Sequence, residues 1–93
     1  MNGYVYILRD ENGKLYVGST DSVERRLQQH LHGHTTTTNR MKKIVLVFTQ
    51  KYATLKEARN IERRLKKLKR KDYLEKIVKE GYIKMHMPSS FNG

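Results

Sequence analysis

The first twenty residues hold two segments typical of β-strands, separated by a short turn sequence. Residues 3–9 (GYVYILR) and 14–20 (KLYVGST) are rich in β-branched and aromatic side chains. The sequence DENG lies between them and is a strong turn signal. The N-terminal segment is therefore predicted to be a β-hairpin.

Two registers of this hairpin are possible, and they differ in where the tyrosines point. A two-residue turn would put Tyr6 and Tyr16 on opposite faces, because strand side chains alternate with period two. A three-residue loop would end with Gly13 in the left-handed conformation and pair Leu8 with Tyr16. It would also pair Tyr6 with Gly18, so that the two tyrosine rings share a face. We predict the three-residue loop.

A helix and a loop are expected to follow the hairpin. The sequence TDS at residues 20–22 offers N-caps for a helix that runs to about Leu31. Its apolar face would carry Val23, Leu27 and Leu31. Residues 32–43 (HGHTTTTNRMKK) have no apolar period and indicate a loop.

The next two elements are a strand and a long helix. The apolar run IVLVFTQ at residues 44–50 predicts a central strand. Thr54, with Glu57 three positions later, forms a capping-box pattern for a helix over residues 55–70. The apolar stripe of this helix consists of Leu55, Ala58, Ile61, Leu65 and Leu68.

The chain is expected to close with a short third helix. Asp72 should cap it and Gly81 should end it. The predicted class is α/β (α+β): a small three-stranded sheet with a β-hairpin, flanked by about three helices, in the order β-β-α-β-α-α. We expect one domain over residues 1–83 and a flexible tail over 84–93. The inward side chains of the third helix would be Leu74, Ile77 and Val78.

The chain carries a large excess of positive charge. Its 93 residues include 20 Lys and Arg against 9 Asp and Glu, which gives a formal net charge of +11. A small soluble domain needs a net charge of only roughly 2–8. The excess points to a polyanionic partner, with nucleic acid ahead of an anionic membrane surface.

The absence of cysteine and the hydropathy of the chain indicate the kind of compartment in which the protein works. The sequence has no cysteine, which excludes disulfides and thiolate metal sites and agrees with a reducing compartment. No leader peptide is evident, and no apolar run approaches the roughly 18 residues of a membrane span. We therefore expect a cytoplasmic protein.

Glu62 interrupts the apolar stripe of the long helix. At about 100° per residue it falls between Leu55 and Ala58 on the helical wheel. Removing an unpaired carboxylate from water is costly, so a cation, a hydrogen-bond donor or a metal ion should lie beside it. An ordinary ion pair with a neighbouring Lys or Arg is the commoner arrangement, and the wheel alone leaves both open.

Arg26 and His30 lie four residues apart on the first predicted helix, so both can reach the same neighbouring surface. Arg25 points nearly opposite and should be solvated. Taken singly, Arg26 fits a rim arginine and His30 a polar helix residue. His30, His32 and His34 also form an H-x-H-x-H string, but the string spans the end of the helix, which disfavours a three-ligand metal site.

The tyrosines and one glycine of the hairpin are ordinary by themselves. Tyr4, Tyr6 and Tyr16 suit strands by propensity. Gly18 marks a place where a side chain would interfere or where a ligand comes close.

Positive charge gathers on the long helix and its end. Nine of the 20 cationic residues fall within residues 56–71, where only Glu57 and Glu62 oppose them before the third helix. A solvated face is the simple explanation, but dense charge of one sign repels itself without a partner. Phosphate contacts would supply that partner. The residues expected to contact nucleic acid are Arg63, Lys66, Lys67 and Arg70 on the helix, with Arg40 and Lys42 in the loop.

These residues, in this order, resemble the GIY-YIG nuclease family. The family's first motif matches YVY at residues 4–6, with Tyr in place of Gly, and its second matches YVG at residues 16–18. Ten residues after the start of the second motif the family has an arginine, here Arg26. Four residues later it has a Tyr or His, here His30. Its metal-binding glutamate falls on Glu62.

The resemblance covers about residues 3–75. The chain looks most like small stand-alone members, which resemble the N-terminal incision domain of the bacterial excision-repair nuclease. It departs from that domain at Ser19, where the repair domain has Lys, and its loop HGHTTTTNR differs from the Gly/Lys-rich loop of many small relatives. These departures bear on the substrate and its positioning.

The resemblance implies a metal-dependent endonuclease that hydrolyses phosphodiester bonds of nucleic acid, with DNA expected, using one Mg²⁺ or Mn²⁺ held by Glu62. Tyr6 would activate or orient water, as base or relay, and Tyr16 would help position the phosphate. A free phenol has a pKa near 10, and Arg26 and the metal are expected to lower the pKa of Tyr6. Arg26 would also stabilise the phosphate oxygens. His30 would be a supporting base or donor.

Two other functions remain open. One is a non-catalytic nucleic-acid-binding module on the same fold. The other is a basic RNA-associated structural protein whose tyrosines stack on bases. A partner protein for targeting is possible in each case, and the sequence leaves the oligomeric state open.

Overall fold

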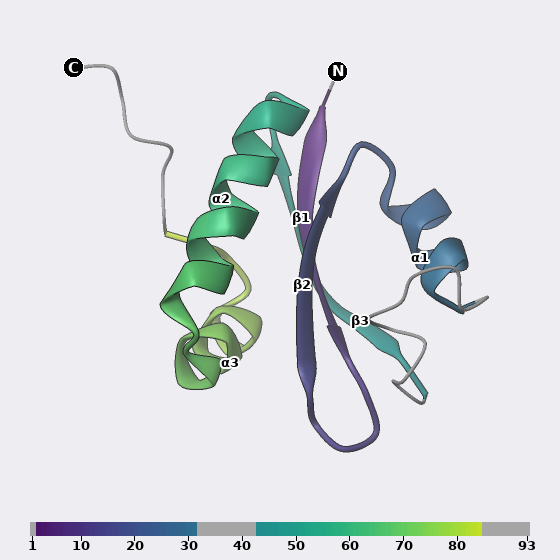
Figure 1. The fold of residues 1–93 in the computed structure, drawn as a ribbon, viewed down its shortest axis with the longest axis vertical. Coiled ribbons are helices and arrows are strands. Elements are labelled where there is room, and N and C mark those ends of the chain that lie inside the picture. Colours follow the sequence, from purple (N-terminus) through teal and green to yellow (C-terminus); the bar gives the residue numbers. More distant parts are fainter. Residues whose placement is uncertain (1, 32–42, 85–93) are drawn as a thin grey trace.

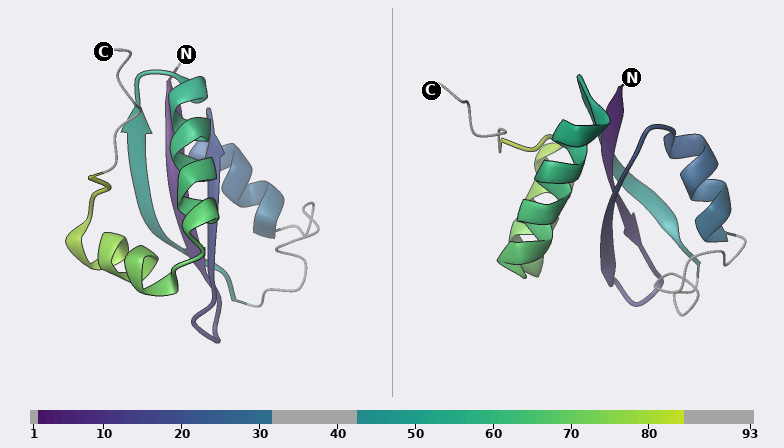
Figure 2. Two further views of the ribbon diagram at one scale, coloured as in Figure 1. Left: turned by 60° about the vertical axis from the view of Figure 1, so that its left-hand side comes forward. Right: turned by 45° about the horizontal axis from the view of Figure 1, so that its top comes forward.

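The protein is a three-stranded sheet with helices on both faces (Figure 1). The computed structural model describes residues 2–31 and 43–84. Helices α2 and α3 lie on one face of the sheet and α1 lies on the other, as the turned views of Figure 2 also show. In chain order the elements are β1 (Gly3–Arg9), β2 (Leu15–Thr20), α1 (Val23–Leu31), β3 (Val45–Tyr52), α2 (Leu55–Leu68) and α3 (Lys71–Glu80).

The predicted fold class and element order are confirmed, and so is the hairpin register. Leu8 pairs with Tyr16 and Tyr6 pairs with Gly18. The backbone N–H of Asp10 donates to the carbonyl of Lys14 at 3.0 Å, which closes a three-residue loop. The last loop residue, Gly13, has φ 81°, a conformation that glycine adopts without strain.

The prediction of a central strand after the loop is wrong, because β1 occupies the centre of the sheet. The strand order is β2-β1-β3, all antiparallel, so β3 lies at an edge. Four consecutive side chains of β1, residues 5–8, are buried, because helices cover both faces of this strand. In β3, by contrast, Val45 is 58% exposed. A continuous apolar run therefore did not distinguish a central strand from an edge strand.

Helix α2 supplies the helical half of the core. Its N-cap forms as predicted, with the Thr54 hydroxyl accepting from the Glu57 N–H at 3.1 Å, while the Glu57 carboxylate accepts at 3.2 Å from the N–H of Ala53, one residue before the N-cap. Such caps satisfy backbone donors that the first helical turn leaves unpaired. The core cluster on this face of the sheet is Val5, Ile7, Val17, Phe48, Ala58, Ile61, Leu65, Ile77 and Ile83.

Three expectations about the helices need correction. Leu31 and Leu68 lie outside the core, 53% and 44% exposed. In α1 the buried residue is His30 instead, because α1 turns that side chain toward the sheet. Helix α3 begins at Lys71 with Arg70 as its N-cap, and Asp72 pairs with the Arg70 guanidinium instead of capping. The end at Gly81 is as predicted, with φ 86°.

The segments predicted as a loop and a tail lie largely outside the described residues. Ile83 is buried, and its backbone N–H donates to Gln50 at 2.7 Å. The chain is therefore packed against β3 up to this position. Within the described ranges, no helix is long and apolar enough to cross a bilayer.

Candidate active site

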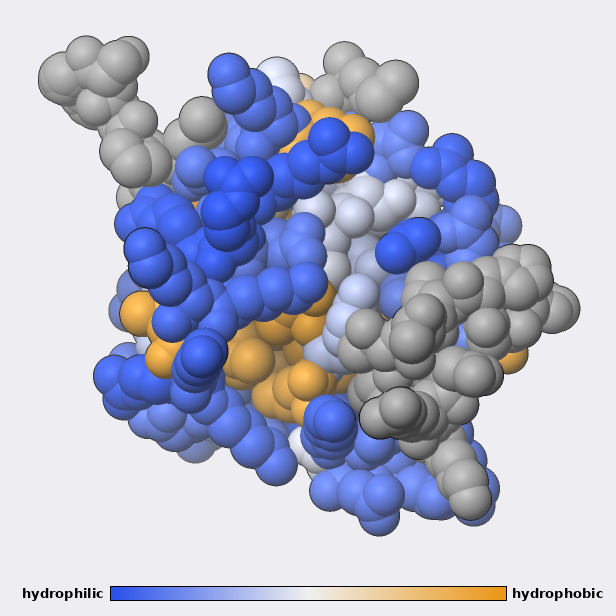
Figure 3. Space-filling model, in the orientation of Figure 1, coloured by the Kyte–Doolittle hydropathy of each residue, from blue (hydrophilic) through white to orange (hydrophobic). Residues whose placement is uncertain are grey.

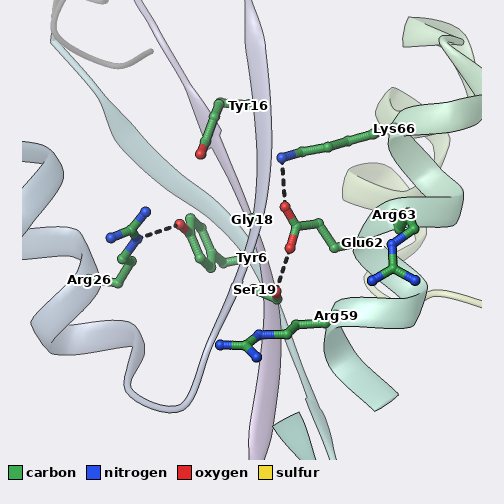
Figure 4. A pocket seen from close by; sticks show the side chains of 9 residues that line it. All are labelled: Tyr6, Tyr16, Gly18, Ser19, Arg26, Arg59, Glu62, Arg63 and Lys66. Carbon is green, nitrogen blue, oxygen red and sulfur yellow. Dashed lines mark hydrogen bonds and ion pairs between the residues drawn. The ribbon is translucent and has the colours of Figure 1, made fainter. Parts of the chain in front are cut away.

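A pocket of about 360 Å³ lies across the exposed edge of β2. Figure 4 shows Arg26 and the two tyrosines on one side of β2, Glu62, Arg63 and Lys66 of α2 on the other, and Arg59 extending from α2 across the strand. The pocket is lined by Tyr6, Tyr16, Gly18, Ser19, Arg26, Arg59, Glu62, Arg63 and Lys66. Residues from four elements, β1, β2, α1 and α2, thus meet at one surface.

The hairpin register brings the two tyrosines together. Their ring centroids are 6.4 Å apart on the face of the sheet that α1 covers. Tyr6 lies across Gly18, its partner on β2: a Cβ added at Gly18 would overlap the hydroxyl oxygen and Cζ of Tyr6. The glycine of the second motif is therefore needed to leave room for the tyrosine of the first.

His30 supports Tyr6 from behind. It is 1% exposed and does not line the pocket. Its Nε2 lies 2.8 Å from the Tyr6 hydroxyl, and its ring meets Tyr16 edge-on with centroids 5.2 Å apart. Burial, reinforced by the Arg26 charge, lowers the pKa of His30, so the imidazole is neutral at pH 7.

The Tyr6 hydroxyl makes two hydrogen bonds: Arg26 determines the direction of one, and the tautomer of His30 determines the direction of the other. Arg26 Nε can only donate, and it lies 3.4 Å from the Tyr6 oxygen. The Tyr6 oxygen accepts that hydrogen bond, so its own hydrogen is available to His30 Nε2. A neutral imidazole can accept it there. With the His30 proton on Nδ1, the three residues form a chain that runs from Arg26 through Tyr6 to His30.

Arg26 lowers the pKa of Tyr6 as expected, but in the protein without a metal ion burial outweighs this effect. Burial raises the pKa of Tyr6 to about 12, and the hydrogen bond from Arg26 offsets only part of this effect. The nearby Tyr16 and Glu62 raise it further. Tyr6 is 2% exposed, so the cost of desolvating a phenolate exceeds the attraction of one guanidinium. Tyr6 is protonated at neutral pH.

Arg26 and Arg25 differ as the helical spacing predicted. Arg26 turns toward the pocket, where its Nη1 also donates to Gln29 at 2.9 Å. Its hydrogen bond to Tyr6 raises the pKa of the guanidinium, which stays charged. Arg25 is 59% exposed and pairs with Asp21. Only one of two adjacent arginines therefore serves the pocket.

Glu62 reaches the pocket from α2, with 20% of its side chain exposed. The Ser19 hydroxyl donates to one carboxylate oxygen, and the Lys66 ammonium lies 2.6 Å from the other. The ion pair that the helical wheel left open is therefore present. It does not exclude a metal ligand, because the carboxylate still faces the pocket.

Sequence reasoning missed two residues that share the pocket with Glu62. Arg59 lies three residues before Glu62 on the same helix face, a spacing that could have identified it. Ser19 was noted only as a departure from the repair domain, yet its hydroxyl holds Glu62. Pairing with Val5 turns Ser19 toward α2, whereas neighbouring Gly18 lies under Tyr6.

The predicted nucleic-acid-binding residues divide into four groups. Arg63 and Lys66 line the pocket. Arg70 lines an adjoining groove, and Lys67 is exposed on α2. Arg40 and Lys42, like His32 and His34 of the histidine string, lie outside the described residues.

The family model of the GIY-YIG catalytic domain matches residues 2–77. A UPF0213 protein of Enterococcus faecalis is 36% identical over 84 residues, which span 87% of this chain and 89% of the relative. The UPF0213 protein YhbQ of Escherichia coli K12 is 37% identical over 79 residues, spanning 84% and 78%.

A solved structure agrees with these matches. The solution NMR structure of the UPF0213 protein BH0048 from Bacillus halodurans is 33% identical, with a TM-score of 0.55 and 87% of each chain covered. The match includes the hairpin, α1 and the stretch of α2 that build the pocket. The chain belongs to the GIY-YIG catalytic domain family.

Proposed function

We propose that the protein is a metal-dependent endonuclease that hydrolyses phosphodiester bonds of nucleic acid, with DNA as substrate and one Mg²⁺ or Mn²⁺ ion as cofactor. Family membership supports a nuclease-type function in general. The pocket across β2 carries the specific proposal: four cationic side chains surround one carboxylate and one hydrogen-bonded tyrosine. Such a site suits a phosphate that gains negative charge during hydrolysis.

Glu62 would hold the metal ion. Its carboxylate and the Ser19 hydroxyl are hard oxygen donors of the kind that Mg²⁺ and Mn²⁺ prefer. The pocket is open and has room for the water molecules that Mg²⁺ retains. When bound, the ion would stabilise the leaving oxygen and the negative charge on the phosphate. Lys66 would then exchange its bond to Glu62 for one to the substrate.

Tyr6 and His30 would act together on the proton of the attacking water. A pKa of about 12 makes a standing phenolate rare at neutral pH. As the Tyr6 oxygen accepts the proton from water, its own proton can pass along the existing hydrogen bond to His30 Nε2. Tyr6 then works as a relay and His30 as the final base.

The remaining residues would position the phosphate. Arg26 lines the pocket beside Tyr6 and would stabilise negative charge on the non-bridging oxygens. Tyr16 faces the same pocket, with Lys66 Nζ 5.3 Å from its ring centroid. Arg59 and Arg63 add positive charge along α2. None of these groups needs a deep substrate cavity, which agrees with a small domain.

The test is a cleavage assay on supercoiled plasmid and labelled oligonucleotides with Mg²⁺, Mn²⁺ or a chelator. The wild type should cut only with metal, while Arg26→Ala and Glu62→Gln should lose cutting and keep nucleic-acid affinity within about tenfold. Arg25→Ala is the matched control, because its guanidinium faces solvent on the same helix. It should cut like the wild type.

The main alternative is a binding module that grips nucleic acid without cutting. The ion pair between Glu62 and Lys66 favours this binding module, because it neutralises the carboxylate that would hold a metal ion. Salt-sensitive binding by a wild type that cuts no substrate with either metal would establish this alternative and refute the nuclease. Loss of folding in Glu62→Gln would instead assign that residue a structural role.

A further inference from the structure

A second, larger groove adjoins the pocket. It has a volume of about 590 Å³ and lies between β2, the C-terminal half of α2 and the start of α3. Its floor is apolar, and Figure 3 shows hydrophobic surface within hydrophilic surroundings on this face of the molecule. The floor residues are Leu15, Val17, Leu65 and Leu74.

The rim of the groove is cationic. Lysine and arginine side chains from the residue before β2, from α2 and from α3 surround the apolar floor. No carboxylate lines the groove in the described part of the chain. An apolar floor with a positive rim matches a ligand made of flat apolar plates joined by anionic links. Nucleobases and phosphates have this composition. The rim consists of Lys14, Lys66, Lys69, Arg70 and Lys71.

The groove continues into the proposed catalytic pocket. Tyr16 and Lys66 line both. A strand with its phosphate in the pocket would therefore place a neighbouring nucleotide over the groove. In a duplex, both faces of that base are covered by its stacking neighbours, so it could not contact the apolar floor unless it left the stack.

We propose that this groove binds an unpaired nucleobase next to the scissile phosphate. Single-stranded or locally unpaired nucleic acid is then the preferred substrate class. This inference rests on the proposed nuclease function. The same polyanion-binding rim would meet a regular duplex through its phosphates alone. The base contact adds affinity that only an unpaired strand can gain.

The test compares the affinities of a fluorescent single strand and of its duplex, measured by anisotropy at equal salt in chelator. Wild type should bind the single strand more tightly. Leu74→Gln should weaken single-strand binding about fivefold, the low end of the contribution of one base contact to an aromatic side chain because leucine is aliphatic, and leave duplex binding nearly unchanged. Leu68→Gln is the matched control, because Leu68 is an exposed leucine of α2 outside the groove.

A second pair of variants guards against misfolding of Leu74→Gln, which thermal unfolding would reveal. Lys71→Glu places a carboxylate on the rim, whereas Lys79→Glu changes an exposed lysine of the same helix away from it. Lys71→Glu should reduce single-strand affinity more than Lys79→Glu does. Equal losses from both, or equal losses for strand and duplex in Leu74→Gln, would overturn the groove proposal.

The result separates this proposal from the nuclease proposal. Single-strand preference that depends on Leu74, in a protein that cuts nothing, would support the groove and refute the nuclease. Cleavage that treats duplex and single strand alike would support the nuclease and overturn the groove. Displacement of the strand by polyglutamate at the same charge concentration would show a general polyanion surface and would also overturn it.

Discussion

Replacing Gly18 with alanine should destabilise the protein through one contact, between the new methyl group and the ring of Tyr6. The alanine Cβ would overlap the Tyr6 hydroxyl oxygen and Cζ and lie 2.9 Å from Cε2. The ring has little freedom to move, because it is buried and its hydroxyl is held by His30 at 2.8 Å.

The size of the effect follows from three contributions. Overpacking by one methyl group costs about 1–3 kcal/mol. Displacing the ring also separates Tyr6 from His30, and breaking a buried hydrogen bond costs about 1–3 kcal/mol. Alanine is favoured over glycine inside a strand by about 0.5–1 kcal/mol. The net loss should be about 1–5 kcal/mol, with Tm falling about 4–8 °C for each kcal/mol.

A double-mutant cycle in urea tests the mechanism as well as the magnitude. In a Tyr6→Val background the ring is gone, so Gly18→Ala should be neutral or slightly stabilising there. The coupling free energy between the two positions should then be about 2–6 kcal/mol, the sum of the two contributions that need the ring. Cleavage should also fall in Gly18→Ala, because the displaced ring loses its place in the pocket.

Gly3→Ala is the matched control for this cycle. A Cβ at Gly3 would lie 2.5 Å from the Leu55 Cα and 2.6 Å from the Thr54 carbonyl oxygen, so its clash is with α2. It should destabilise the protein equally in both Tyr6 backgrounds. The reasoning is refuted if Gly18→Ala costs the same with and without the Tyr6 ring, or if Gly3→Ala couples to Tyr6 as strongly.

Three further predictions address separate parts of the structure. The pKa of His30 is lowered in the folded protein, so the unfolded state takes up a proton at higher pH than the folded state does. The free energy of unfolding of the wild type should therefore fall as pH drops below about 6.5, by at most about 1.4 kcal/mol per pH unit. Urea unfolding at several pH values would measure this fall, which His30→Gln should not show. Thr54→Ala should cost about 1 kcal/mol by loss of the α2 cap, and a change below about 0.3 kcal/mol in thermal unfolding would contradict this. Lys66→Met should tighten Mn²⁺ binding to the protein alone by up to about fivefold, because the ion no longer competes with the Lys66–Glu62 ion pair, which is worth about 0–1 kcal/mol. Weaker Mn²⁺ binding in electron paramagnetic resonance titrations would contradict this prediction.

Local rules were enough to predict the features that depend on a few neighbouring residues. The position of Gly13 in the turn predicted the hairpin register, and with it the shared face of Tyr6 and Tyr16. The spacing of Thr54 and Glu57 predicted the start of α2. The helical wheel identified Glu62 as a carboxylate that needs partners, because period 3.6 alone determines which side chains share a helix face.

Features that depend on competition between groups distant in sequence could not be predicted from local rules. Hydrophobicity favoured Leu31 as the inward residue of α1, but the Tyr6 hydroxyl needs a buried partner, and His30 takes the inward position. The central place of β1 depends on which strand receives helices on both faces. The pKa of Tyr6 depends on whether burial or Arg26 dominates, and burial is a property of the packed molecule.

The charges of the pocket bear on how metal and substrate would enter it under the proposed function. Arg26, Arg59, Arg63 and Lys66 bring four positive charges, and Glu62 brings one negative charge. A divalent cation approaching alone meets net repulsion, and Lys66 already occupies one carboxylate oxygen of Glu62. A substrate phosphate reverses this balance, because it attracts the cations and offers Lys66 another partner. Metal and nucleic acid should therefore bind with positive cooperativity, so Mn²⁺ affinity should rise when a non-cleavable strand is present. Equal Mn²⁺ affinity with and without the strand would mean that the α2 cations do not control access to Glu62.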